Sequence, residues 1–141
     1  MRRFVQNESG VGAIEFALIG PLLVTMFLGI FASWSYMRQS SNMRDSVEAA
    51  SKYYIQGGSV DATALALGNS AWTNKPSGAT LVITRSKLCG ATVVTTAVCS
   101  DSSIPQVKLL VKANSTWVDP TSSSIFPDGL NIEQKETIRV R

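Results

Sequence analysis

Hydrophobic residues are concentrated near the N-terminus of the chain. From Phe16 to Met37 there is no formally charged residue, and most of the side chains are apolar. As an α-helix rising about 1.5 Å per residue, this segment would cover roughly 33 Å, which is enough to cross the hydrocarbon core of a bilayer. We therefore predict a single transmembrane helix whose membrane span covers about residues 14–37.

Two other structures would also account for an apolar run. A secretory signal peptide has an apolar region of only about 7 to 15 residues before a small-x-small cleavage site. The nearest such pattern here is Ser33-Trp34-Ser35. The second alternative is a buried core helix, for which the run is unusually long. The length of the segment favours the membrane span over both.

After residue 37 the pattern becomes that of an amphipathic helix. Apolar side chains recur three or four residues apart and form one stripe: Met43, Val47, Ala50 and Tyr54. The Gly57-Gly58 pair then ends the helix. The sequence thus predicts one continuous helix over residues 11–56. Because Pro21 removes a backbone hydrogen bond inside this helix, we expect a kink or local melting there.

The remaining residues, 57–141, predict a small domain with a short helix and an antiparallel sheet. Asp61 is placed to cap a helix that runs to about Trp72, with Leu65 and Trp72 on its inner face. Strands are predicted at residues 79–85, 92–98, 106–113 and 132–141. Residues 114–131 form a long connection, with Trp117 and Phe126 as candidate anchors. The predicted fold class is α+β, with a sheet of three to four strands.

Composition and charge limit the classes of function. At 141 residues the chain has room for one compact domain. Its 13 Lys and Arg residues are scattered among acidic ones, so no basic stripe predicts a nucleic-acid partner. The chain has no His, and it lacks the spacings of a metal site or a P-loop. We therefore predict no enzymatic activity, no metal and no cofactor.

The two cysteines indicate the compartment of the C-terminal domain. Cys89 and Cys99 lie close together in the sequence, in a Ser/Thr/Val-rich segment. A disulfide is the simplest interpretation, and closing so short a loop stabilises a small domain by roughly 2 to 3 kcal/mol. Two separate buried thiols are the alternative. Because disulfides persist in oxidising compartments, the domain is expected outside the cytoplasm.

Glu15 is the residue of the N-terminal segment that needs an explanation. On insertion scales, an acidic side chain at the centre of a membrane helix costs about 2.5 to 3.5 kcal/mol, and less near its end. One interpretation is that Glu15 lies at interfacial depth, where the helix dipole favours a negative charge. A second interpretation follows from the surrounding residues, Gly10-Val11-Gly12-Ala13-Ile14-Glu15-Phe16.

This segment resembles the processing site of type IV prepilin-like proteins. A membrane peptidase cuts those proteins after a Gly and leaves Glu as the fifth residue of the mature chain. Further similarity to the TadE-like family of the tight-adherence (Tad/Flp) pilus system covers roughly residues 10–31, including Ala13-Ile14-Glu15-Phe16-Ala17-Leu18, Pro21-Leu22-Leu23 and Gly29-Ile30-Phe31. Flp major pilins carry Glu-Tyr and are much shorter, so Phe16 and the chain length favour a TadE-like minor pseudopilin.

The resemblance implies a function and a set of partners. Residues 1–10 would be a leader peptide cut between Gly10 and Val11, and Glu15, Phe16 and Pro21 would take part in subunit assembly. The implied protein is a minor pilin or pseudopilin of a Tad-type (type IVc) pilus, with roles in pilus assembly, adhesion and surface colonisation. Its partners would be prepilin peptidase, other pilin subunits, the inner-membrane assembly platform and membrane lipid.

The implied location is the bacterial inner membrane, with a single pass. The N-terminus would be cytoplasmic before processing and the C-terminal domain periplasmic, with incorporation into an extracellular pilus as a further expectation. Two alternatives remain open: a minor pseudopilin of type II secretion, and a permanently membrane-anchored binding module outside the cytoplasm.

Overall fold

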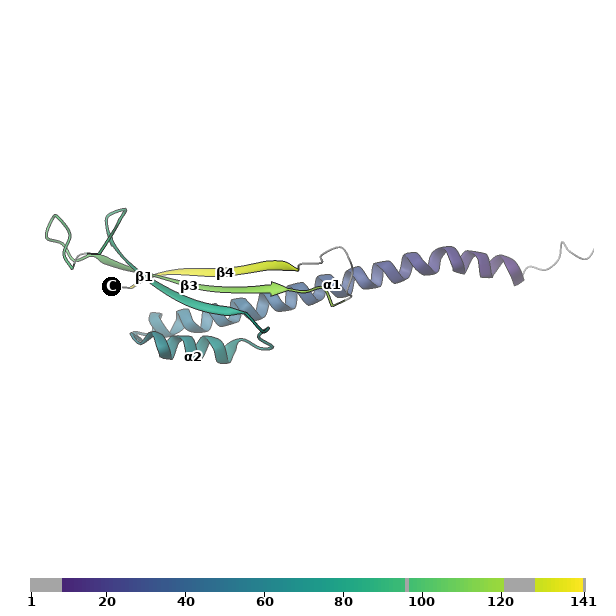
Figure 1. Ribbon diagram of the computed structural model, residues 1–141, viewed down its shortest axis with the longest axis horizontal. Helices are drawn as coiled ribbons and strands as arrows, with labels where there is room; N and C mark the ends of the chain where they lie inside the picture. The colour runs from purple at the N-terminus through teal and green to yellow at the C-terminus, as the bar shows by residue number, and fades with distance from the viewer. Residues whose placement is uncertain (1–8, 96, 121–128, 141) are drawn as a thin grey trace, which may run out of the picture.

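The computed structural model describes residues 9–95, 97–120 and 129–140, which form two helices and one sheet (Figure 1). The elements are α1 (Ser9–Ile55), α2 (Asp61–Ala71), β1 (Thr80–Cys89), β2 (Thr92–Val94), β3 (Gln106–Trp117) and β4 (Leu130–Val140). All strand pairs are antiparallel, in the order β2-β1-β3-β4. The predicted α+β class is confirmed.

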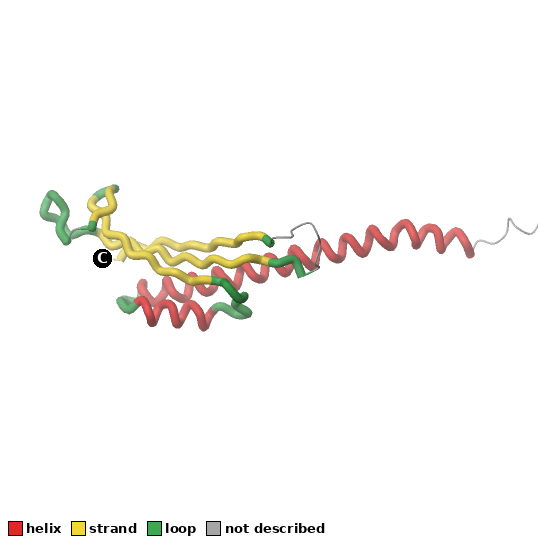
Figure 2. The backbone as a smooth tube through the Cα atoms, in the orientation of Figure 1, coloured by secondary structure: helices red, strands yellow, loops and turns green. Residues whose placement is uncertain are grey.

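Helix α1 is much longer than the domain it belongs to. Its C-terminal half lies along the sheet and beside α2, whereas its N-terminal half projects beyond the ends of the strands (Figure 2). The helix also continues through Pro21 without a break. Of the two expectations for Pro21, local melting is therefore wrong, because the helix on either side is long enough to tolerate the loss of one backbone hydrogen bond, and a kink stays a prediction.

The hydrophobic core lies between the C-terminal half of α1 and the inner face of the sheet. The predicted stripe is confirmed, since its four residues are all buried: Met43, Val47, Ala50 and Tyr54. From the sheet, Leu109, Val111, Ala113 and Trp117 of β3 are buried against the helix side. Buried residues recur about every 3.6 residues on α1 and every second residue on β3, and these two sets pack against each other.

Helix α2 packs closely on α1 because a glycine lies between them. A Cβ atom added to Gly68 would be 2.9 Å from the backbone oxygen of Ser46 and 3.2 Å from the Cβ atom of Ala50. The buried residues of α2 are Ala64 and Gly68, while Leu65 is only half-buried. The predicted inner face is therefore partly wrong: Trp72 is buried, but the contact is made by the smallest side chains.

The predicted capping role of Asp61 is also wrong. Val60 is the N-cap residue of α2, and no side chain caps this end. The Asp61 carboxylate instead accepts hydrogen bonds from the Tyr54 hydroxyl and from the Arg85 guanidinium, whose Nε lies 3.0 Å from Oδ1. A charged donor gives a stronger hydrogen bond than a backbone amide, so the carboxylate turns toward Arg85.

This cluster changes the titration of its members. The Arg85 guanidinium, followed by the Tyr54 hydroxyl, lowers the pKa of Asp61 below its usual value. Burial, together with the hydrogen bond to Asp61, raises the pKa of Tyr54. The cluster joins α1, α2 and β1 at the end of the domain distant from the projecting half of α1.

The strands differ in length from those predicted. β1 continues to Cys89 and β3 to Trp117, whereas β2 ends at Val94. The connection predicted at residues 114–131 thus begins at residue 118, because Ser115 and Trp117 continue the buried face of β3. Trp117 is confirmed as a buried anchor. Phe126 lies outside the described residues.

The outer face of the sheet carries cations that the linear sequence does not bring together. Lys108 lies directly opposite Arg139, and Lys112 directly opposite Lys135. Glu133 offsets part of this charge, since its carboxylate is 2.6 Å from Lys112 Nζ and 3.8 Å from Lys135 Nζ. Lys112 also lowers the pKa of Glu133. The basic residues are therefore less scattered in the fold than the sequence indicates.

Candidate membrane and assembly segment

The projecting half of α1, residues 12–31, has the surface of a membrane-spanning or subunit-packing helix. All of its residues are exposed except Gly20, which is half-buried. Large apolar side chains are found all around this part of the helix: Ile14, Phe16, Leu18, Ile19, Leu22, Leu23, Val24, Met26, Phe27, Leu28, Ile30 and Phe31. A helix that is apolar on every side needs an apolar environment.

Length and composition agree with this interpretation. Among the described residues, one helix is long and apolar enough to cross a membrane, namely Gly12–Ile55, with a window of mean hydropathy 2.1. Two hydroxyl groups in its apolar N-terminal half are satisfied within the helix. Thr25 Oγ1 donates to the Leu22 carbonyl at 2.8 Å, and Ser33 Oγ donates to the Gly29 carbonyl at 2.8 Å. The segment can thus enter lipid without leaving these donors unpaired.

Glu15 is exposed on α1, beyond the first turn of the helix. The favourable effect of the helix dipole falls off within that turn, so it offers this carboxylate little stabilisation. Within the part of the chain that the structure describes, Glu15 forms no ion pair. A carboxylate in an otherwise apolar segment therefore has its charge available to another molecule.

The other residues predicted for assembly lie on the same segment. Phe16 and Pro21 are exposed, and the Phe16 ring is 3.8 Å from the position that a Cβ atom of Gly20 would occupy. No atom lies within 4 Å of such a position at Gly12 or Gly29. These glycines leave open strips on the helix that allow close approach of a neighbouring helix.

Gly10 and Val11 lie in the first turn of α1. They precede Glu15 by five and four residues, so the residues predicted for processing and for assembly are consecutive parts of one helix. Cleavage between Gly10 and Val11 remains a prediction.

Sequence reasoning missed the junction at which α1 enters the domain. The Trp117 indole nitrogen donates to Ser35 Oγ at 3.1 Å, and the Trp117 ring meets Tyr36 edge-on. One turn further along α1, Gln39 Nε2 donates to Ser115 Oγ at 2.8 Å. The available signal was a pair of polar residues, Ser35 and Gln39, four apart at the end of an apolar run.

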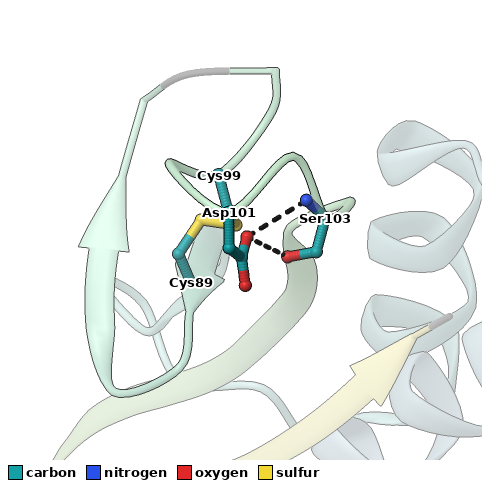
Figure 3. The surroundings of a disulfide bond; sticks show 4 residues. All are labelled: Cys89, Cys99, Asp101 and Ser103. Atoms are coloured by element: carbon teal, nitrogen blue, oxygen red, sulfur yellow. Dashed lines mark hydrogen bonds between the residues drawn. A yellow bond between two sulfur atoms is a disulfide. The ribbon is translucent and has the colours of Figure 1, made fainter.

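The disulfide lies at the opposite end of the molecule from the projecting half of α1. Cys89 and Cys99 are bonded, with Cα atoms 5.7 Å apart (Figure 3). In the turn that follows, Asp101 Oδ1 accepts hydrogen bonds from Ser103 Oγ at 2.6 Å and Ser103 N at 3.0 Å. These bonds from Ser103 lower the pKa of Asp101. The predicted disulfide is present, and it fixes the loop beyond the β1–β2 hairpin.

The described residues contain no group of three or more His, Cys, Asp or Glu side chains that could hold a metal ion. What the structure does offer is an exposed apolar helix with one carboxylate, attached rigidly to a small disulfide-bonded domain. Such an arrangement is suited to anchoring and to packing against other helices.

Comparisons with known proteins agree with this assessment. Residues 10–51 match the family model described as TadE-like protein, so the resemblance predicted from the motif is confirmed for this segment. The match supports association with a Tad pilus, whose TadE-like components are structural proteins. It covers α1 as far as Ser51 and leaves α2 and the sheet outside. No curated protein and no solved structure matches the chain.

Proposed function

We propose that this TadE-like protein is a minor pilin or pseudopilin of a Tad-type (type IVc) pilus, acting in pilus assembly, adhesion and surface colonisation. The observation that carries the proposal is the TadE-like segment itself, an exposed apolar half-helix in which Glu15 is the acidic residue. A helix with this surface can remain in lipid as an anchor, or pack with equivalent helices in a filament.

Processing would prepare the segment to leave the lipid and pack with other helices in a filament. Cleavage between Gly10 and Val11 by prepilin peptidase removes Arg2 and Arg3, which hold the N-terminus at the cytoplasmic face. It also creates a free amine on Val11. Before processing the protein is a single-pass protein of the bacterial inner membrane, with its domain in the periplasm, where the disulfide is stable.

Glu15 would then set the position of one subunit relative to the next. In an apolar bundle of helices, its carboxylate pairs with the Val11 amine of a neighbouring pilin subunit. Two buried charges that neutralise each other avoid the large cost of burying either one alone. The pairing occurs at one axial offset, so it fixes the register of the helices while the assembly platform adds subunits.

The mature N-terminus tests the processing step. In a strain with a Tad system, we expect sequencing of the purified protein to begin at Val11. A Gly10→Lys variant should retain Met1. A Gly12→Lys variant, in which a matched glycine two residues later is replaced, should still be cleaved between residues 10 and 11. An intact Met1 in the unaltered protein would favour a permanently anchored binding module instead.

Charge replacement tests the assembly step. A Glu15→Gln variant keeps the size of the side chain but cannot neutralise an amine, so we expect it to be processed yet depleted from pili. Glu48→Gln is the control, because Glu48 is an exposed carboxylate of the same helix whose partner, Lys52, lies within the chain at 2.7 Å. Normal incorporation of processed Glu15→Gln would contradict the pairing.

A further inference from the structure

The domain meets α1 at a level where a membrane surface is expected. Ala32 packs against the core of the domain, and Pro120 lines a hollow of about 210 Å³ together with Phe31 and Trp34. The part of α1 free of the domain is therefore residues 12–31, about 30 Å of helix. That length equals the hydrocarbon thickness of a bilayer. The domain begins where the lipid core ends.

The predicted membrane span leads to the same conclusion. It covers about residues 14–37, and so it overlaps the first residues of α1 that contact the domain. If the span ends as late as residue 37, the adjoining part of the domain lies within the interface. If it ends at residue 31, that part of the domain rests on the surface. In both cases the residues around Trp117 lie at the depth of the lipid headgroups.

The side chains at this level are suited to such an environment. Ala32, Ser33, Tyr36, Met37, Trp117 and Leu130 line a second hollow of about 260 Å³. Several large apolar residues around the junction remain exposed to solvent: Val118 at 70%, Met37 at 67% and Trp34 at 53%. Trp and Tyr are enriched at membrane interfaces, and exposed apolar groups there gain from contact with lipid.

Cations lie beside the aromatic rings. The Arg38 guanidinium carbon is 5.3 Å from the centroid of the Trp34 ring, and Lys75 Nζ is 5.2 Å from that of Trp72. Long basic side chains next to the end of a span reach the headgroups, where lipid phosphates are their natural partners. Apolar, aromatic and basic groups thus follow one another in the order found across a bilayer surface.

The junction holds these groups in a fixed arrangement. The hydrogen bonds from Trp117 to Ser35 and from Gln39 to Ser115 join β3 to α1 on two successive turns of the helix. The sheet cannot swing away from α1 without breaking both bonds. The position of the helix in the membrane therefore determines the position of the end of the domain.

From these observations we propose that the end of the domain at which Val118 and Leu130 are exposed, beside the buried Trp117, is a lipid-binding surface that docks on the outer face of the membrane. Val118 and Leu130 contact the upper part of the acyl chains, and Arg38 pairs with lipid phosphate. The inference rests on the proposed function only in taking residues 12–31 as the membrane span. The membrane thus contacts the folded domain as well as its anchor.

Tryptophan quenching by brominated lipid tests the docking. The full chain is reconstituted in vesicles of phosphatidylcholine and phosphatidylglycerol, with bromine on the upper acyl carbons. In a Trp34→Phe background, Val118→Trp places a reporter at the proposed surface and Ile104→Trp places one at the distal tip. Because Trp72 and Trp117 remain in this background, the emission of each reporter is the difference between its variant and the Trp34→Phe protein. Both positions are strongly exposed, at 70% and 86%, so tryptophan can be accommodated without repacking the core.

We expect the tryptophan at position 118 to lose most of its emission in brominated vesicles. Its emission should also lie at a shorter wavelength than that of tryptophan in aqueous buffer. The tryptophan at position 104 should keep its emission. Equal quenching at both positions, or quenching at neither, would overturn the docking.

The native Trp34 separates this proposal from the proposed function. The contribution of Trp34 to the emission is the difference in emission between the unaltered protein and the Trp34→Phe variant. If Trp34 is quenched and position 118 is not, the helix is anchored and the docking of the domain is wrong. If Trp34 is also unaffected, residues 12–31 do not span the vesicle membrane, and both the anchoring and the docking are overturned.

Discussion

The two halves of α1 have the same backbone structure but opposite surroundings. In the C-terminal half, Val47 is 4% exposed, and it belongs to a stripe covered by the sheet and α2. In the N-terminal half, Val24 is 57% exposed, and its apolar neighbours surround the helix. A stripe needs only a partner on one side, whereas a fully apolar surface needs an apolar solvent or several partners. One helix therefore packs on the domain at one end and presents a surface suited to a membrane at the other.

The largest expected effect comes from placing the same polar group in each half. Val47→Asn buries an amide in the core and should destabilise the domain by about 2 to 4 kcal/mol. Val24→Asn is the matched variant, and it should leave domain stability unchanged while weakening membrane insertion. Urea denaturation in detergent measures the first effect, and carbonate extraction of membranes measures the second. Equal destabilisation by both variants would contradict the division of the helix.

Removing the disulfide should have the next largest effect, and it should be confined to the domain. The double variant Cys89→Ser, Cys99→Ser frees a short loop in the unfolded chain and should cost about 2 to 3 kcal/mol. Because the bond lies at the distal tip, membrane insertion should not change. An unaltered urea midpoint would show that the bridge contributes nothing to stability.

Two glycines provide a smaller and sharper comparison. Gly68→Ala places a methyl group 2.9 Å from the backbone oxygen of Ser46, so α2 must move away from α1. We expect a net loss of about 1 to 2 kcal/mol, although alanine by itself favours a helix. Gly29→Ala meets no atom within 4 Å. It should preserve the stability of the monomer and reduce incorporation into pili, if Gly29 faces a neighbouring helix.

The smallest expected effect is a pH dependence. The pKa of Asp61 is lower in the folded protein than its usual value near 3.8, so the unfolded chain binds a proton more readily. The contribution of Asp61 to stability is thus present above its usual pKa, and it is lost as the pH falls through the lowered value. Because Asp61 and Arg85 are partly exposed, this contribution should stay below about 1 kcal/mol.

Thermal midpoints of the unaltered protein and of Asp61→Asn, measured from acid to neutral pH, would reveal this effect. The difference should be constant above about pH 5 and disappear in strong acid. A difference that persists in acid would mean that Asp61 acts through packing rather than through its charge.

Local patterns were sufficient to predict much of α1. The stripe from Met43 to Tyr54 depends only on helical spacing, and the apolar run depends only on length. The motif around Gly10 and Glu15 is likewise contiguous, and the TadE-like resemblance of this segment is confirmed, whereas processing stays a prediction. Features that follow from neighbouring residues were therefore accessible without the structure.

Features that depend on strand pairing were not accessible. A strand was predicted only as far as Ala113, where the apolar alternation ends, although Ser115 continues the same face of β3 and is buried and bonded to Gln39. The opposed cations of β3 and β4 depend on a register that no short motif specifies. Asp61 resembled a helix cap because Arg85, its actual partner, lies on another element.

The long strands lie lengthwise along the axis of α1 (Figure 1). A pull between the disulfide-bonded tip and the apolar end of the helix would therefore act along β3 and its neighbours, whereas the hydrogen bonds between antiparallel strands lie across that direction. Such a load shears many bonds together instead of opening them one after another. The domain is thus oriented to resist stretching along the axis on which a filament would pull it.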